Sequence, residues 1–71
     1  MRTSTYGVIG MTCEHCVRSV TEEVGEVSGV SGVDVDLASG RLVVTAADDV
    51  PDAAIAEAVT EAGYSLGPAP A

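Results

Sequence analysis

Residues 33–45 read VDVDLASGRLVVT, a segment in which two short apolar runs flank a turn. In both runs apolar side chains alternate with other residues, and the alternating positions are Val33, Val35, Leu37, Leu42 and Val44. A period of two is typical of strands that bury one face and leave the other wet. The small residues at 38–40 suit a tight turn. The segment therefore predicts a β-hairpin with one solvated face.

A helical pattern stands on each side of this hairpin. The first covers Glu14 to Gly25, and the second follows Pro51 and stops at Gly63. Their apolar positions, spaced as on one face of a helix, are Val17, Val20 and Val24 in the first and Ile55, Ala58, Val59 and Ala62 in the second. Proline among acidic residues is typical of a helix start, and glycine of a helix end. Each predicted helix has a single apolar face.

Strand-forming residues lie at both ends of the chain, at Thr3–Ile9 and at 64–66. The resulting order, β-α-β-β-α-β, predicts an α+β ferredoxin-like sandwich. In that fold both helices cover one face of a four-stranded antiparallel sheet. We expect residues 1–71 to form a single domain, with 67–71 as a frayed tail.

Charge and hydropathy exclude several classes of partner. Eleven acidic residues against three arginines give the 71-residue chain a net charge of -8. Such a chain repels phosphate backbones and anionic membrane surfaces, so we expect neither nucleic acid nor a membrane as a partner. The N-terminus lacks the apolar stretch of a signal peptide, and no run of apolar residues is long enough to span a bilayer. We therefore expect a cytoplasmic protein.

The chemistry of the chain is concentrated in residues 10–16, between the first strand and the first helix. Cys13 falls at the helix cap and Cys16 in the first turn, so both sulfurs can converge where free N–H groups and the helix dipole favour thiolate. In a reducing compartment this C-x-x-C spacing indicates metal ligands or a redox pair rather than a structural disulfide.

The number of ligands indicates which metal suits the pair. A structural zinc site needs four protein ligands, whereas two cysteines and one histidine offer three at most. Cu(I), a soft ion, is satisfied by two thiolates. The alternative is a thiol-disulfide oxidoreductase. It is disfavoured because such enzymes usually carry an aromatic residue before the first cysteine, where this chain has Met11 and Thr12.

The run from Gly10 to Cys16 resembles the G-M-T-C-x-x-C signature of heavy-metal-associated domains. Residues 29–33 resemble that family's G-V-x-x-V segment and 62–64 its A-G-Y ending, so the resemblance covers nearly the whole chain. Within the family the chain is most similar to small bacterial copper chaperones of the CopZ type. The resemblance implies a protein that is not an enzyme. It also implies that Cys13 and Cys16 bind Cu(I) and pass it to a copper-exporting P-type ATPase.

Several alternatives stay open within this resemblance. The chain could carry Hg, Zn or Cd instead, or be a metal-binding domain detached from the ATPase itself. A copper-sensing regulator is a second candidate partner. We expect a monomer without metal and, because a two-coordinate ion leaves room for further thiolates, a copper-linked dimer at excess copper.

Three neighbours of the cysteines are candidates for tuning the site. The family counterpart of Met11 packs beneath the loop, so we expect Met11 to fill the core. His15 projects about 100° around the helix from Cys16, which leaves ligation, tuning of the pH response and no role as alternatives. Tyr64 approaches from the end of the second helix and is expected to shield the metal or to hydrogen-bond near a thiolate.

Overall fold

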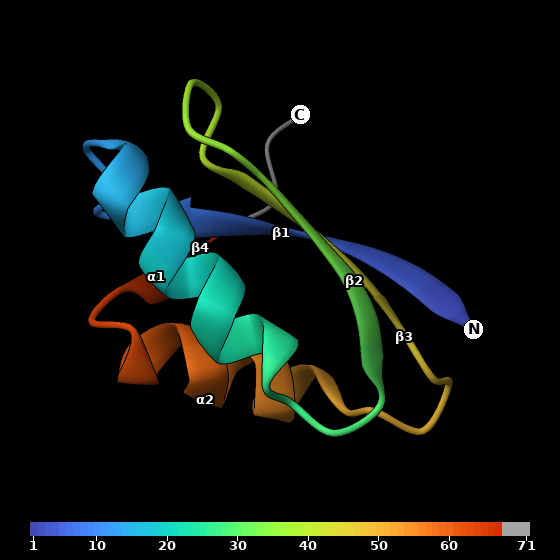
Figure 1. The fold of residues 1–71 in the computed structure, drawn as a ribbon. Helices are drawn as coiled ribbons and strands as arrows, with labels where there is room; N and C mark the ends of the chain where they lie inside the picture. Colours follow the sequence, from blue (N-terminus) through green and yellow to red (C-terminus); the bar gives the residue numbers. More distant parts are fainter. Residues whose placement is uncertain (68–71) are drawn as a thin grey trace.

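The computed structural model describes residues 1–67. Six elements follow the predicted order, namely β1 (Arg2–Ile9), α1 (Glu14–Gly25), β2 (Val30–Asp36), β3 (Arg41–Ala46), α2 (Asp52–Glu61) and β4 (Ser65–Gly67). The four strands form one antiparallel sheet in the order β2-β3-β1-β4. Both helices lie on the same face of this sheet (Figure 1). The predicted ferredoxin-like sandwich is confirmed.

A small aliphatic core fills the space between the helices and the sheet. Its fully buried side chains are Val20, Val24, Leu42, Val44, Ile55 and Val59. The helical stripe of α1 differs from the prediction at one position. Cys16 is buried together with Val20 and Val24, whereas Val17 is only half-buried. The spacing of 16, 20 and 24 places these three residues on one side of the helix, because residues four apart face the same way.

The ends of the strands differ slightly from the prediction. β1 begins at Arg2, and Leu37 lies in the turn rather than in a strand. The expectation that Gly67 belongs to a frayed tail was wrong, because Gly67 pairs with Gly7 as the last residue of β4. The rest of that predicted tail, residues 68–71, lies outside the described residues.

Two long-range contacts fix the ends of the sandwich. At one end the tip of the hairpin lies against β1, where Val8 N donates to the carbonyl oxygen of Gly40 over 2.8 Å. Gly40 has φ +71°, and a Cβ atom there would come within 3.1 Å of the Val8 carbonyl oxygen, so glycine is required for this approach. At the other end the hydroxyl of Tyr6 donates to Asp52, the first residue of α2, over 2.7 Å.

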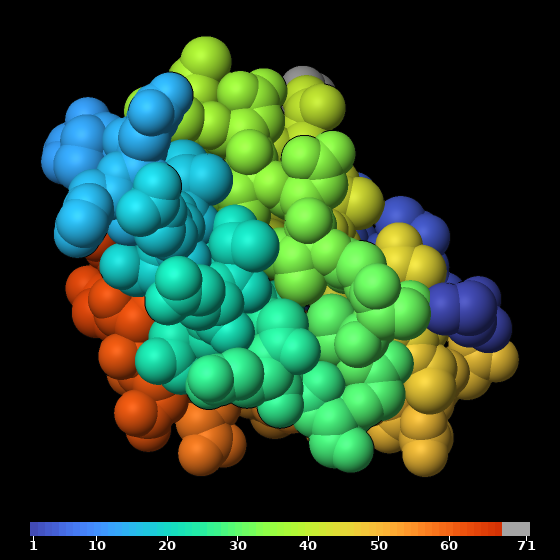
Figure 2. All heavy atoms as spheres, viewed as in Figure 1, coloured from blue at the N-terminus to red at the C-terminus, as the bar shows by residue number. Residues whose placement is uncertain are grey.

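None of the helices in the described part of the chain has the length and apolar character needed to cross a membrane. In the space-filling view, α1 covers much of the face turned toward the viewer (Figure 2). The segment that leads into α1 protrudes at one edge, near the tip of the hairpin (Figure 2).

Candidate metal centre

The loop from β1 to α1 begins with a sharp change of direction at Gly10. This residue has φ +101°, a conformation that side chains other than glycine adopt only with strain. A Cβ atom at this position would lie 3.4 Å from Cδ1 of Tyr64. The glycine therefore both turns the chain and lets the tyrosine ring, which follows α2, approach the start of the loop.

The two cysteines stand at the N-terminal end of α1. Cys13 is the N-cap residue, with an extended backbone (φ -158°, ψ 171°), and its carbonyl oxygen accepts a hydrogen bond from the N–H of Cys16 at 3.0 Å. This first helical turn brings the two Sγ atoms to 3.6 Å from each other. Cys13 is exposed, whereas Cys16 keeps only 8% of its surface accessible. The structure thus brings the predicted pair together and distinguishes its members by burial.

Hydrogen bonding favours the thiolate form of Cys16. The pKa of Cys16 is lowered from 9.0 to about 6, first by hydrogen bonding with the backbone of Thr12 and then by the side chain of Tyr64. Burial acts in the opposite direction, and the backbone and side chain of Cys13 add smaller lowering contributions. A thiolate that accepts several hydrogen bonds at the start of a helix is stabilised relative to the thiol. Cys16 is therefore largely ionised at neutral pH.

Tyr64 takes part in this stabilisation as a hydrogen-bond donor. The pKa of its hydroxyl is raised, chiefly because the hydrogen bond to Cys16 holds the phenolic proton, with burial as the next cause. Because the raised pKa keeps the tyrosine protonated at neutral pH, its hydroxyl can donate to the Cys16 thiolate there.

Met11 and His15 occupy different environments. Met11 is half-buried and packs against the hydrophobic core, while His15 is exposed on the first turn of α1. Among residues 1–67, no three side chains of His, Cys, Asp or Glu lie close enough to hold one metal ion together. In this conformation, then, His15 does not join the two cysteines in a three-ligand cluster.

Sequence reasoning missed two features of the site. The hydroxyl of Thr12 lies 3.9 Å from Sγ of Cys16, close enough for a weak hydrogen bond with sulfur. The spacing of four residues between Thr12 and Cys16 could have indicated this contact. The burial of Cys16 was missed as well, although Val20 and Val24 continue its helical face.

Two adjacent sulfurs, one with a lowered pKa and the other exposed, are a donor set that suits a soft metal ion. A sequence model of the heavy-metal-associated domain matches residues 5–65 of this chain, which include both cysteines and all six elements in full or in part. The chain belongs to the heavy-metal-associated domain family.

Individual members of the family are similar over nearly the whole chain. The copper chaperone CopZ of Bacillus subtilis (strain 168) is 43% identical over 67 residues, which are 93% of this chain and 97% of that protein. The zinc/cadmium/lead-transporting P-type ATPase of Shigella sonnei (strain Ss046) is 42% identical over 62 residues, 87% of this chain but only 8% of the ATPase. Relatives of this domain thus include both free-standing chaperones and short segments of much longer transporters.

Comparison with solved structures shows that members of this family share the fold of this chain. A copper-binding domain from HMA7, a P-type ATPase, superposes with a TM-score of 0.90 at 34% identity, covering 94% of this chain and 92% of that one. The family and the resemblance to CopZ that the sequence indicated are therefore confirmed.

Proposed function

We propose that this heavy-metal-associated domain is a copper chaperone that binds one Cu(I) through Cys13 and Cys16. The observation that carries the proposal is the pair of Sγ atoms 3.6 Å apart, one exposed and the other ionised at neutral pH. Thiolates are the ligands that soft ions prefer, and a sulfur that is already deprotonated need not lose a proton when the metal binds.

The ligand count favours Cu(I) over zinc, cadmium or lead, the ions named for the ATPase relative. Tetrahedral zinc needs four donors, whereas the described residues group no third His, Cys, Asp or Glu with the pair. Two-coordinate Cu(I) needs no ligand beyond the two thiolates. At thiolate–metal distances of about 2.3 Å a linear ion needs its sulfurs about 4.6 Å apart. The pair, now 3.6 Å apart, would open on binding, and the exposed Cys13 is the member free to move.

Delivery by thiolate exchange follows from the same asymmetry. Because Cys13 is exposed, a thiolate of a partner can bond to the ion before Cys13 and Cys16 release it, through a three-sulfur intermediate. The partner we propose is the metal-binding domain of a copper-transporting P-type ATPase, since relatives of this chain occur within such transporters. A copper-sensing regulator with a similar cysteine pair is a second candidate for the same exchange.

The neighbours of the pair have separate roles in this proposal. Tyr64 stabilises the Cys16 thiolate through its hydroxyl, and Met11 supports the loop by packing on the core. His15, exposed beside Cys13, is available as an additional ligand only when several copper ions or a second molecule are present. In that state we expect a copper-linked dimer, while the protein without metal is a monomer.

The chain acts in this proposal as one cytoplasmic domain that carries an ion and performs no catalysis. A thiol-disulfide oxidoreductase would use the same two cysteines to reduce disulfides. Insulin reduction separates the two functions, because the carrier is expected to give no turnover above that of a simple dithiol.

The direct test is an anaerobic titration with Cu(I) against a competing chelator, with Zn(II) in a parallel series. We expect one tightly bound Cu(I) per monomer and a much lower affinity for Zn(II). Cys13→Ser and Cys16→Ser should each abolish the tight binding, while Ser19→Ala, on the next turn of α1, serves as the control and should retain it. Chelator-resistant Cu(I) in both cysteine variants would overturn the assignment of the site.

A further inference from the structure

The distance between the two cysteine sulfurs restricts the shape of the centre that they can hold without moving. The Sγ atoms lie 3.6 Å apart, so a soft ion about 2.3 Å from each, a typical metal–thiolate distance, would bond to them at an angle of about 100°. A linear ion needs the sulfurs on opposite sides and therefore needs the pair to open. The pair as it stands matches a bent centre more closely than a linear one.

The short separation is held by the fold around Cys16. This residue is buried on the same side of α1 as Val20 and Val24, and its N–H donates to the carbonyl oxygen of Cys13 over 3.0 Å. The hydroxyl of Thr12 lies 3.9 Å from its sulfur. Because one sulfur is anchored in the core and the helical turn brings the other beside it, the folded chain favours the bent geometry.

The number of donors decides which bent centre fits. Tetrahedral zinc needs four ligands, and within residues 1–67 no further His, Cys, Asp or Glu side chain groups with the pair. Trivalent arsenic forms three bonds, because a lone pair occupies the fourth corner and bends the bonds into a pyramid. It also prefers soft sulfur donors. Two cysteine sulfurs and one oxygen from water would complete its coordination.

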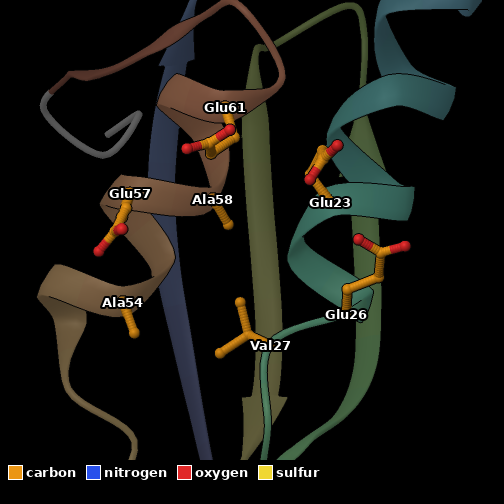
Figure 3. A pocket seen from close by; sticks show the side chains of 7 residues that line it. All are labelled: Glu23, Glu26, Val27, Ala54, Glu57, Ala58 and Glu61. Carbon is orange, nitrogen blue, oxygen red and sulfur yellow. The ribbon is translucent and has the colours of Figure 1, made fainter.

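The charge of the chain selects the form in which arsenic can approach. The net charge is -8, and the groove between α1 and α2 alone carries four glutamates (Figure 3). This negative field repels oxyanions such as arsenate. Arsenous acid, As(OH)3, is uncharged at neutral pH and meets no such barrier. The trivalent acid can therefore reach the exposed sulfur of Cys13.

We propose that Cys13 and Cys16 also chelate trivalent arsenic, taken up as arsenous acid, in a pyramidal centre of two sulfurs and one hydroxide. The reaction is a condensation in which two As–S bonds replace two As–O bonds. Two protons, from the thiols or from solvent, leave with the released hydroxides as two water molecules, and arsenic stays trivalent. Cys13 forms the first bond, after which Cys16 closes the chelate at high effective concentration.

This inference rests on the proposed role of the two cysteines as metal ligands, and it makes arsenite a competitor of copper at that site. The first experiment is an anaerobic titration of the reduced full chain with arsenite, followed by X-ray absorption at the arsenic edge. We expect one arsenic per chain with two sulfur neighbours and one oxygen. Three sulfur neighbours would mean that a second chain completes the centre, which would overturn the proposal.

Substitutions test whether both sulfurs take part. Cys13→Ser and Cys16→Ser should each weaken arsenic binding about a hundredfold, because a single sulfur loses the gain from chelation. Ser19→Ala, on the next turn of α1, is the matched control and should bind as the original protein does. Undiminished binding in either cysteine variant would contradict the chelate.

Thermal unfolding tests whether the fold itself contributes. Arsenite should raise the midpoint of unfolding, because the pair held by the fold binds it more tightly than the flexible C-x-x-C segment of the unfolded chain does. An unchanged or lowered midpoint would show that the folded geometry does not favour the pyramidal centre, and the proposal would fail.

Competition with Cu(I) separates this inference from the proposed function. Loading with arsenite first should lower the amount of Cu(I) bound, and simultaneous binding of both at full occupancy would overturn the shared site. Copper binding without any arsenic binding would sink this inference alone. Arsenic bound as a two-sulfur centre by a chain that fails to bind Cu(I) would support it and contradict only the proposed copper function.

Discussion

The Sγ atoms of Cys13 and Cys16 lie 3.6 Å apart, yet one thiol is exposed and the other is buried beside Val20 and Val24. The two cysteines therefore differ as parts of the fold. In the proposed function Cys13 serves only the metal, whereas Cys16 serves both the metal and the core.

This asymmetry predicts different effects of two similar substitutions on the stability of the metal-free protein. Cys16→Ser places a hydroxyl in a buried position and should lower the free energy of unfolding by about 1–2 kcal/mol. Cys13→Ser, at an exposed position, should change it by less than about 0.5 kcal/mol. Urea unfolding followed by circular dichroism measures both. Equal destabilisation would contradict the burial difference described here.

The lowered pKa of Cys16 predicts how stability depends on pH. Its folded-state value is about 6, against 9.0 for an unperturbed thiol. Below the folded value the thiol is protonated in both states, so the contribution is absent. It grows as pH rises through about 6 and is complete above 9.0, where the unfolded thiol also ionises. Thermal unfolding at several pH values should show this rise, and the rise should be missing in Cys16→Ser.

Removing the tyrosine hydroxyl near the thiolate should shift that titration. Tyr64→Phe keeps the ring against Gly10 but loses a hydrogen bond to Cys16, so the pKa of Cys16 should increase. The ultraviolet absorbance of the thiolate, followed against pH, reports this change. Tyr6→Phe is the matched control, because the hydroxyl that it removes donates to Asp52 and not to a cysteine. A similar shift in the control, or none in Tyr64→Phe, would refute the role given to Tyr64.

Shortening Met11 should affect the fold rather than the number of sulfur ligands. The side chain is half-buried against the core, so Met11→Ala should cost about 1–2 kcal/mol, below the range for fully buried methionines. X-ray absorption of the copper-loaded variant should still give two sulfur ligands. One sulfur fewer, with unchanged unfolding, would show that the thioether binds copper.

Copper transfer should require contact with the acceptor. If the ion passes directly to a thiolate of the partner, as proposed, the observed rate should rise with the concentration of an ATPase metal-binding domain. Given the net charge of -8, the rate should also fall with salt when that domain presents a basic face. Stopped-flow measurements at several acceptor and salt concentrations test this. A rate that is independent of the acceptor would mean that copper dissociates first.

The order of the six elements could be predicted from the sequence because its signals are local. Valines at helical spacing predicted α1 with the same bounds as in the structure. The alternation of apolar and other residues on both sides of Gly40 predicted the hairpin. The cysteine spacing likewise placed both sulfurs at the start of α1, because it depends on the geometry of a single helical turn. The family, too, could be recognised from short motifs.

Only the tertiary structure decided which of these residues meet across the chain. It buried Cys16 where Val17 was expected, and it placed Gly67 in the sheet opposite Gly7. The tertiary structure also brought the ring of Tyr64 against Gly10, which lies 54 positions earlier in the sequence. It lined the groove between α1 and α2 with glutamates from both sides. Periodicity fixes a residue's face on its own element. Contacts between elements depend on which strands pair in the sheet and on how closely small residues let the helices approach each other. The sequence of one element does not determine these contacts, because packing is a property of the whole folded chain.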